Sequence, residues 1–497
     1  MEPEPADPLD DESTDKAVVN IVDNDQEASE VTGPVPASWE EALDKKPVDA
    51  ANLNLEPYEY QQDGIRWIVG LASQSLNCAE NSCPPFGALL ADDMGLGKTF
   101  MSLSAIDEYY RRCADRDIPR RPVLVVAPLS LLENWKDEVE KVFVNSPFSD
   151  IVVLQSSADL PKFKVDDTGR ETRQQLGDDD AVATIRFSLK TRATDYIVDG
   201  LDQPGRLVLT TYQTLRDYQF SLCTIDWSFV VFDEAQNIKN PNALQTRAAK
   251  GLKAKFRLAV TGTPVENELR DFWCLFDTVR PSLMGSYQWF RQKFVSPIRA
   301  ANDDERDEVR VRVGEELRDR SAGLMLRRLK EDNLEGMPEK KIWVGTAPFG
   351  PAEEYCSAMT SVMKGVQRDR YEMIIGATRE AMGEEQQSGV ALKGLHALRA
   401  VSLHPDCIEG GSPHMPATAK AAREEIAKSG KLQTMLDTIE QIRGRDEKVI
   451  LFCMTKSVQR FLQVALEQIY GGNVHIINGD TKAVKTARGG QTRKSLI

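Results

Sequence analysis

Residues 86–114 read FGALLADDMGLGKTFMSLSAIDEYYRRCA, and this stretch decides the fold. A short apolar run, a loop with two glycines and an amphipathic segment follow one another, which predicts a strand, a loop and a helix. Glycines let backbone N–H groups face phosphate oxygens, and the start of a helix favours their negative charge. Lys98 would reach the β- and γ-phosphates of a nucleotide, and Thr99 would ligate magnesium. The loop departs from the usual G-x-x-x-x-G-K-[ST] pattern because Asp92 stands at its first glycine position.

Apolar runs of the same kind recur along the chain and alternate with helical stretches. In order they read LLAD, VLVVAP, IVVLQ, RLVLTT, FVVFDEA and FRLAVTGT. Buried strands that alternate with helices indicate an α/β protein with a parallel, doubly wound sheet. Ligands of such sheets lie beyond the carboxyl ends of the strands, so polar residues at these ends should converge on one crevice.

Two of the runs end in residues suited to nucleotide hydrolysis. Asp233 would hold the magnesium shell, and Glu234 would orient or deprotonate the attacking water. An isolated Asp-Glu pair is usually a solvated surface feature, but the phosphate loop upstream favours the catalytic interpretation. The hydroxyls of Thr261 and Thr263 could sense the γ-phosphate and pass that state to a nucleic-acid side. An ordinary turn is the alternative for this segment.

The ordered series of motifs resembles the Swi/Snf-like DNA-dependent ATPases of helicase superfamily two, in their bacterial or archaeal form, over residues 50–497. The motifs are Tyr60-Gln61 with Gly64 and Trp67, DDMGLGKT, APLSLLENWKDEV from Ala127, LTTYQTL from Leu209, DEAQNIKNP from Asp233, LAVTGTPVENELRDFWCLFD from Leu258, LRRLKEDN from Leu326, MPEKK from Met337, LHALRAVSLHP from Leu395, SGKLQTML from Ser429, and VILFCMT followed by IINGDT. The resemblance implies a P-loop NTPase with RecA-like lobes and a helical insertion. It also implies ATP and Mg²⁺ as cofactors and double-stranded DNA as a partner, held largely without regard to sequence.

The resemblance carries roles onto matching positions of this chain. The catalytic residues would be Lys98, Asp233 and Glu234. The nucleotide would be held by Gln61, which would contact adenine, and by Asp93, Met94, Gly95, Leu96, Gly97, Lys98 and Thr99, with Thr99 and Asp233 at the magnesium. Coupling of hydrolysis to DNA would involve Gln236, Thr261, Gly262, Thr263, Arg327 and Arg328, although an arginine pair is often only a solvated face. The DNA backbone would lie along Pro128, Ser130, Thr211, Tyr212, Gly479 and Thr481.

The composition limits the other classes of function. The net charge of −15 opposes nucleic-acid binding, but much of the acidity lies in the first thirty or so residues and in the segment 164–180, for which we find no chemistry. No apolar run approaches the roughly 18 to 20 residues that span a bilayer, and the acidic N-terminus is unlike a signal peptide. We therefore expect no membrane partner and a cytoplasmic, nucleoid-associated location.

Metal sites and base stacking are not expected from the remaining signals. The eight cysteines are scattered, and the close pair Cys78 and Cys83 has no second pair at zinc-ligand spacing. The four histidines form no group at short helical spacing, which argues against a histidine-based metal site. Three tryptophans in predicted helices are expected to pack in the core rather than to stack on bases, namely Trp135, Trp273 and Trp289.

We predict a disordered acidic tail over 1–40, a first RecA-like lobe over 41–300, a helical connector over 301–430 and the start of a second RecA-like lobe over 431–497. The second lobe should contain strands at EKVILFCMT and VHIING with a helix between them. A parallel domain usually needs about five strands, so this lobe is expected to be incomplete. The family's late arginine motif, which completes the ATP site, would fall after Ile497.

Two functions follow from these expectations. One is a motor that couples ATP hydrolysis to tracking along double-stranded DNA and displaces or remodels bound proteins, within a repair, transcription or defence complex. The other is a catalytically incomplete ATP- and DNA-binding fragment or subunit that needs the remaining lobe or an arginine in trans.

Overall fold

The computed structural model describes residues 36–77, 86–166, 168–171, 187–263, 268–302, 305–334, 336, 361–384, 388–479 and 481. The chain divides into two compact units, and the described residues up to Gly336 belong to the first unit and those from residue 361 to the second. Most of the predicted acidic tail, the pair Cys78 and Cys83, and the acidic residues 172–180 lie outside the described residues.

The first unit is built on a parallel sheet of seven strands in the order β3-β4-β2-β5-β6-β1-β7. The strands are β1 (Phe86–Leu90), β2 (Val123–Val126), β3 (Ile151–Leu154), β4 (Leu207–Thr210), β5 (Asp226–Asp233), β6 (Lys253–Val260) and β7 (Met325–Leu326). Every pairing is parallel, so the predicted α/β fold and its six predicted strands are confirmed. The seventh strand was not predicted because two residues are too few to form a pattern.

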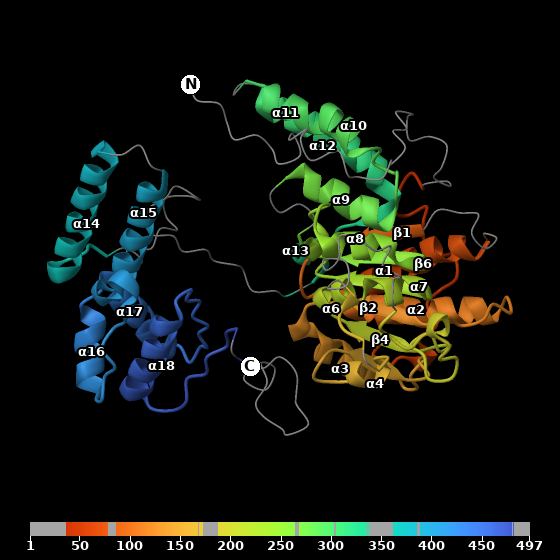
Figure 1. Cartoon of the computed structure of the whole chain (residues 1–497), viewed down its shortest axis with the longest axis horizontal. Coiled ribbons are helices and arrows are strands. Elements are labelled where there is room, and N and C mark those ends of the chain that lie inside the picture. Colours follow the sequence, from red (N-terminus) through yellow and green to blue (C-terminus); the bar gives the residue numbers. More distant parts are fainter. Residues whose placement is uncertain are drawn as a thin grey trace. The chain divides into compact units, whose positions relative to one another are not determined.

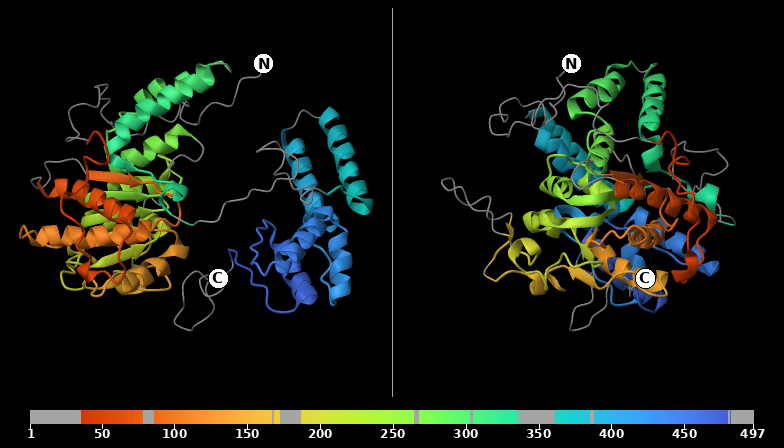
Figure 2. Two further views of the ribbon diagram at one scale, coloured as in Figure 1. Left: turned by 180° about the vertical axis from the view of Figure 1, so that it is seen from behind. Right: turned by 90° about the vertical axis from the view of Figure 1, so that its right-hand side faces the viewer.

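Helices surround this sheet (Figure 1). They are α1 (Glu59–Gln74), α2 (Lys98–Ala114), α3 (Leu132–Val142), α4 (Leu160–Phe163), α6 (Tyr212–Asp217), α7 (Gln219–Thr224), α8 (Leu244–Gly251), α9 (Leu269–Val279), α10 (Tyr287–Phe290), α11 (Ser296–Ala300), α12 (Arg306–Ser321) and α13 (Lys330–Asn333). Helix α2 packs against α1 and α3, whereas α8 packs against α6, α7 and α9. Helix α12 extends away from the sheet in both views of Figure 2.

The core of the first unit explains why its strands are continuous apolar runs. Strands β1, β2 and β4 are buried at every residue because helices cover both faces of the sheet. In the central strands, the rings of Phe229 and Phe256 lie 4.9 Å apart and both side chains are fully buried. The carboxyl ends of β1, β2, β4, β5 and β6 therefore share one edge of a rigid platform.

The second unit is helical where the structure describes it. It contains α14 (Gly365–Glu384), α15 (Ser388–Leu403), the 3-10 segment η11 (Pro405–Gly410), α16 (Ala419–Ala427), α17 (Gly430–Gly444) and α18 (Lys456–Tyr470). A small apolar core joins α16, α17 and α18 through residues such as Ile426, Leu436 and Phe461.

The two strands predicted in the second unit are a wrong prediction. Residues 447–455 and 474–479 flank α18 as predicted, but the structure gives neither segment as a strand. An apolar β-branched run forms a strand only when another strand accepts its backbone hydrogen bonds. Ile450 and Phe452 instead have relative exposures of 79% and 95%. The partial RecA-like character of this unit, like the predicted domain boundaries, stays a prediction.

No helix in the described part of the chain is both long enough and apolar enough to cross a bilayer.

We predict that Phe256→Ala will lower the free energy of unfolding of the first unit by about 3–5 kcal/mol, because the lost ring leaves a cavity between fully buried strands. The measurement is urea denaturation followed by tryptophan fluorescence, since six of the seven tryptophans precede residue 300. Val311→Ala on α12 is the control, because Val311 is 62% exposed and should change stability by less than about 0.5 kcal/mol. Equal losses in the two variants would contradict the placement of this core.

Candidate functional site

The loop between β1 and α2 has the backbone shape that a phosphate-binding loop needs. Gly95 and Gly97 have φ angles of +92° and +85°, a left-handed conformation that side chains disfavour. A Cβ added at Gly97 would also lie 2.5 Å from Nε2 of Gln61. Gln61 donates from that same nitrogen to the carbonyl of the buried Leu96 at 3.2 Å. The structure thus brings Gln61 to the loop, and only glycine fits at position 97.

Lys98 begins α2 and is held by the loop itself. Its Nζ donates to the carbonyl oxygens of Asp92 at 2.7 Å and Asp93 at 3.1 Å. Burial lowers the pKa of Lys98, and nearby carboxylates, including those of Asp233 and Glu234, oppose that shift. The carboxylate of Asp92 opposes the shift most, and the predicted catalytic lysine also interacts electrostatically with both predicted catalytic carboxylates.

Asp233 at the end of β5 is buried and tightly oriented. Its Oδ2 accepts from Nε1 of Trp135 at 2.7 Å, and its Oδ1 accepts from the backbone N–H of Glu234 at 3.0 Å. Burial raises the pKa of Asp233, whereas the bond from Trp135 lowers it. Trp135 is 1% exposed, as the predicted core position requires, yet it also positions Asp233. The sequence signal for this role is the indole N–H, which needs a partner when buried.

Glu234 begins a chain of hydrogen bonds that links the predicted coupling residues. Gln236 donates to the Glu234 carboxylate at 2.8 Å and accepts from the hydroxyl of Thr261 at 2.9 Å. That hydroxyl also accepts from the backbone N–H of Thr263 at 3.0 Å. Glu234 has a φ of +49°, and backbone strain of this kind is found at functional sites.

Gly262 lies between Thr261 and Thr263 and faces the phosphate loop. A Cβ added there would lie 3.2 Å from Cγ of Met94 and 3.9 Å from Nζ of Lys98. Met94 itself is 61% exposed. The segment after β6 therefore faces the same loop as the predicted nucleotide residues.

Arg328, which follows β7, forms a buried ion pair with Asp92. The guanidinium contacts both oxygens of Asp92, with two distances of 3.1 Å, and the backbone N–H of Arg328 donates to the same carboxylate at 2.9 Å. Arg328 also donates to the carbonyl of Tyr60, beside Gln61. The unusual acidic residue at the first position of the loop thus has a partner.

The backbone around this pair reinforces the connection. The N–H of Asp93 donates to the carbonyl of Arg328 at 3.0 Å, and the N–H of Lys330 donates to the Asp93 carboxylate at 3.1 Å. Arg327, next in the chain, is exposed. Of the predicted arginine pair, only Arg328 contacts the loop.

The residues predicted along DNA form part of a cavity of about 600 Å³ at the carboxyl ends of β2 and β4. Pro128, Thr211 and Tyr212 line it, and Ser130 is half-buried two residues after Pro128. The hydroxyl of Tyr212 donates to the carbonyl of Asp233 at 2.7 Å. One hydrogen bond therefore connects this cavity to the residue proposed for magnesium.

The last two predicted DNA contacts lie in the second unit. Gly479 is exposed in a turn, and the backbone N–H of Thr481 donates to the carbonyl of Asn478 at 3.2 Å. Their role at DNA stays a prediction.

The residues present fit ATP with Mg²⁺. Thr99 is the second residue of α2, where unpaired backbone N–H groups favour phosphate, and its hydroxyl is of the type that ligates magnesium in such loops. Asp233 supplies a fixed carboxylate of the type that hard cations prefer. The left-handed glycines of the loop leave open the space that side chains would fill.

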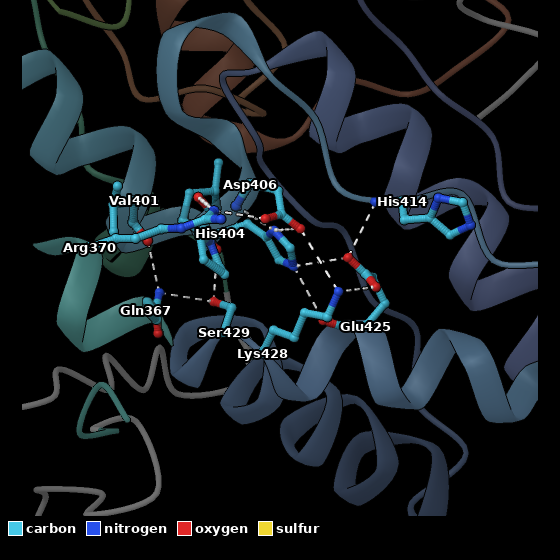
Figure 3. Close-up of polar contacts among 11 residues, drawn as sticks. Gln367, Arg370, Val401, His404, Asp406, His414, Glu425, Lys428 and Ser429 are labelled. Atoms are coloured by element: carbon cyan, nitrogen blue, oxygen red, sulfur yellow. Dashed lines mark hydrogen bonds and ion pairs between the residues drawn. The ribbon is translucent and has the colours of Figure 1, made fainter. Parts of the chain in front are cut away.

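Figure 3 shows a second polar cluster, in the second unit, where His404, Asp406 and Glu425 point toward one another. The histidine Nδ1 accepts from the backbone N–H of Asp406 at 3.2 Å, and Nε2 lies 3.2 Å from the carbonyl of Glu425. A carbonyl accepts only, so the proton is on Nε2 and the ring is neutral. Lys428 and Arg370 lie 2.7 and 2.8 Å from the carboxylates of Glu425 and Asp406. These two cations already balance the acidic groups, so the cluster joins α14, η11 and α16 rather than offering free ligands.

The sheet, the glycine-shaped loop and the carboxylate after β5 define a P-loop domain of the RecA-like type. The chain belongs to the family of the SNF2-related domain, whose model matches residues 60–405. It thus carries a Swi/Snf-family ATPase domain.

Three known proteins are similar to this member of the SNF2-related family. The Zorya protein ZorD of Escherichia coli is 34% identical over 88% of this chain and 36% of its own length. The putative ATP-dependent helicase/translocase YwqA of Bacillus subtilis is 27% identical over 84% of this chain and 38% of its own length. The solved Sulfolobus solfataricus SWI2/SNF2 ATPase core in complex with dsDNA is 23% identical, covers 85% of this chain and 72% of that chain, and has a TM-score of 0.43. The chain spans just over a third of the length of the two curated relatives.

We predict that Arg328→Met will lower the free energy of unfolding by about 3–5 kcal/mol, because it leaves the Asp92 carboxylate buried without its cation. Urea denaturation followed by tryptophan fluorescence measures this loss. Arg327→Met is the matched control, since the same change at the exposed neighbour should cost less than about 0.5 kcal/mol. Similar stabilities for the two variants would show that the ion pair contributes little.

We predict that lowering the pH from 7 to 5 will destabilise the second unit through His404. Burial lowers the pKa of His404 from its ordinary value of about 6.5, and Lys428 acts in the same direction, against the Glu425 carbonyl and the carboxylates of Asp406 and Glu425. A neutral ring favoured in the folded state contributes stability that is present above pH 6.5. This stability is lost as the pH falls toward the lowered folded-state pKa.

The measurement is an NMR titration of the imidazole protons, with His404→Asn to assign the signal among the four histidines. Denaturation of that variant should also depend less on pH than that of the original chain. A His404 midpoint at or above 6.5 would contradict the proposed neutral ring.

Proposed function

We propose that this chain is an ATP-hydrolysing motor that tracks along double-stranded DNA and displaces or remodels DNA-bound proteins. The observation that carries the proposal is the bond from the Tyr212 hydroxyl to the Asp233 carbonyl. It joins a cavity at the proposed DNA-facing edge to the backbone of the residue that carries the buried carboxylate of the proposed nucleotide site. A change at either place can therefore be transmitted to the other through one contact.

The chain's own residues divide the chemistry among them. Magnesium bound with ATP supplies positive charge that neutralises charge developing on the phosphoryl group. Glu234 orients and deprotonates the attacking water, which requires the side-chain position that Gln236 fixes at 2.8 Å. Lys98 leaves the loop carbonyls and contacts phosphate oxygens. Trp135 and the Glu234 N–H hold Asp233 in the orientation needed at the cation.

The hydrogen bonds beyond Glu234 support coupling to the nucleic acid. Gln236 links the carboxylate that acts on water to Thr261, and Thr261 holds the backbone of Thr263. Loss of the γ-phosphate would change the position of Glu234 and so the segment after β6. Arg328 connects the phosphate loop to the chain segment that follows β7.

The proposed DNA contacts explain binding without sequence preference. Thr211 and Pro128 stand at the starts of short helices, where backbone N–H groups and hydroxyls favour phosphate oxygens rather than base edges. The YwqA relative carries the words helicase/translocase in its name, which agrees with tracking. Partners in a repair, transcription or defence complex and an association with the nucleoid remain part of the proposal.

We predict that linear double-stranded DNA will stimulate ATP hydrolysis by this chain, and that Glu234→Gln will reduce the stimulated rate by on the order of 10²–10⁴-fold, because the water loses its base. Steady-state phosphate release measures the rate. Lys98→Ala is the control for a contaminating ATPase and should abolish turnover. Glu133→Gln, a change of the same kind on α3, should leave the rate unchanged.

Turnover that survives Lys98→Ala would refute the assignment of this site. Tight ATP and DNA binding without turnover would instead favour the second function, a binding subunit completed by an arginine supplied from elsewhere.

A further inference from the structure

The segment between β3 and β4 forms one wall of the cavity at the DNA-facing edge. Pro128, Thr211 and Tyr212, which follow β2 and β4, line the same cavity. The wall contributed by the segment contains Gln155, Ser156, Leu160, Pro161, Lys164 and Arg170. None of these six residues belongs to the motifs that define the family resemblance, and no chemistry was predicted for the acidic segment 164–180, which contains Lys164 and Arg170. The structure places two of its cations beside the proposed DNA contacts.

A buried carboxylate fixes this wall in place. Glu171 is completely buried and accepts from the backbone N–H groups of Ser188 at 2.8 Å and Phe220 at 2.7 Å. Ser221 donates to Glu171 from its hydroxyl, and that hydroxyl accepts from the N–H of Leu189 at 3.0 Å. One acidic residue thereby joins residues on both sides of 172–186 to the start of α7.

The hydrogen bonds around Glu171 and Ser221 also position the backbones of Lys164 and Arg170. Lys164 pairs in an antiparallel bridge with Leu189, which is held by Ser221, and Arg170 directly precedes Glu171. Their backbones are therefore anchored to the rigid sheet through α7, not carried on an independent loop. A preorganised cation loses less entropy when it binds an anion.

The described residues that line the cavity include two cations and one carboxylate. Among the described lining residues, Asp217 is the one carboxylate, and it is shared by Arg170 at 3.4 Å and Arg216 at 2.8 Å. Lys164 lies 5.8 Å from the ring centroid of Tyr218 and has no carboxylate partner among the described residues. The side chain of Arg170 is 52% exposed, whereas that of Asp217 is 7% exposed. Lys164 is thus available to an anion that enters the cavity, and Arg170, which shares Asp217 with Arg216 and is half exposed, can contact the same anion.

We propose that this cavity binds a phosphate of the duplex DNA backbone, with Lys164 and Arg170 as the residues that neutralise it. The inference rests on the proposed function and adds a contact outside the family's motifs. This phosphate would lie next to the DNA phosphate proposed at Thr211. Thr211 is the N-cap residue of α6. Tyr212 lines the same cavity and donates to the Asp233 carbonyl, so the proposed phosphate contact shares its cavity with a residue that bonds to the proposed nucleotide site.

The experiment measures the affinity of the full chain for a labelled 20-bp duplex by fluorescence anisotropy across a range of salt concentrations. Lys164→Gln, Arg170→Gln and the double variant are compared with the original chain. Loss of the one phosphate contact should reduce the slope of log affinity against log salt by about 0.9, so the double variant should lose about 0.9 and each single variant no more than that. The dissociation constant of the double variant at about 0.1 M salt should rise on the order of tenfold for duplexes of any sequence.

Lys162→Gln is the matched control, because Lys162 is exposed on the same segment, pairs with Asp159 and does not line the cavity. It should keep the original slope. An unchanged slope in the double variant, or an equal loss in the control, would overturn the inference and leave the proposed function standing if the original chain binds DNA. Absence of DNA binding by the original chain would overturn both.

Discussion

The buried pair of Asp92 and Arg328 is the constraint on which the nucleotide site depends. A carboxylate at the head of a phosphate loop would repel phosphate if it were free, and a buried charge without a partner is costly. Arg328 removes that conflict and at the same time contacts the carbonyl of Tyr60, next to Gln61. Three segments that are distant in sequence therefore meet at one guanidinium. Gly95 and Gly97 can take their left-handed conformation because they lack a Cβ, and the ion pair fixes the start of the loop that contains them.

The sheet supplies the second constraint, which is geometric. Parallel strands bring their carboxyl ends to one edge, so Asp233 after β5 and Thr211 after β4 lie on the same side of the platform. Tyr212 and Trp135 connect these strand ends by hydrogen bonds. Tyr212 donates to the carbonyl of Asp233, and Trp135 donates to its carboxylate. Polar groups that are buried need partners, and here the partners are the functional residues themselves. The bonds that stabilise this region are therefore the same bonds that we propose for coupling.

Much of the first unit could be predicted from sequence because buried parallel strands are continuous apolar runs and polar residues follow them. The phosphate loop, Asp233 and Glu234 were predicted on this basis. The partner of Asp92 could not be, because Arg328 lies 236 positions later and a charge pattern does not specify a distant contact. Trp135 was predicted only as a core residue, since an apolar pattern does not show where an indole N–H points. The prediction of two strands beside α18 was wrong for a similar reason. An apolar segment does not reveal whether a partner strand is present.

The central claim is that DNA and nucleotide affect one another through Tyr212, and the most direct test is their thermodynamic coupling. The affinity for a fluorescent ATP analogue is measured with and without saturating duplex DNA, for the original chain and for Tyr212→Phe. We expect at least about a fivefold change in ATP-analogue affinity on adding DNA to the original chain, with the reciprocal effect on DNA binding. In Tyr212→Phe that coupling should be largely lost while each ligand still binds. An unchanged coupling in the variant, or none in the original chain, would contradict the account.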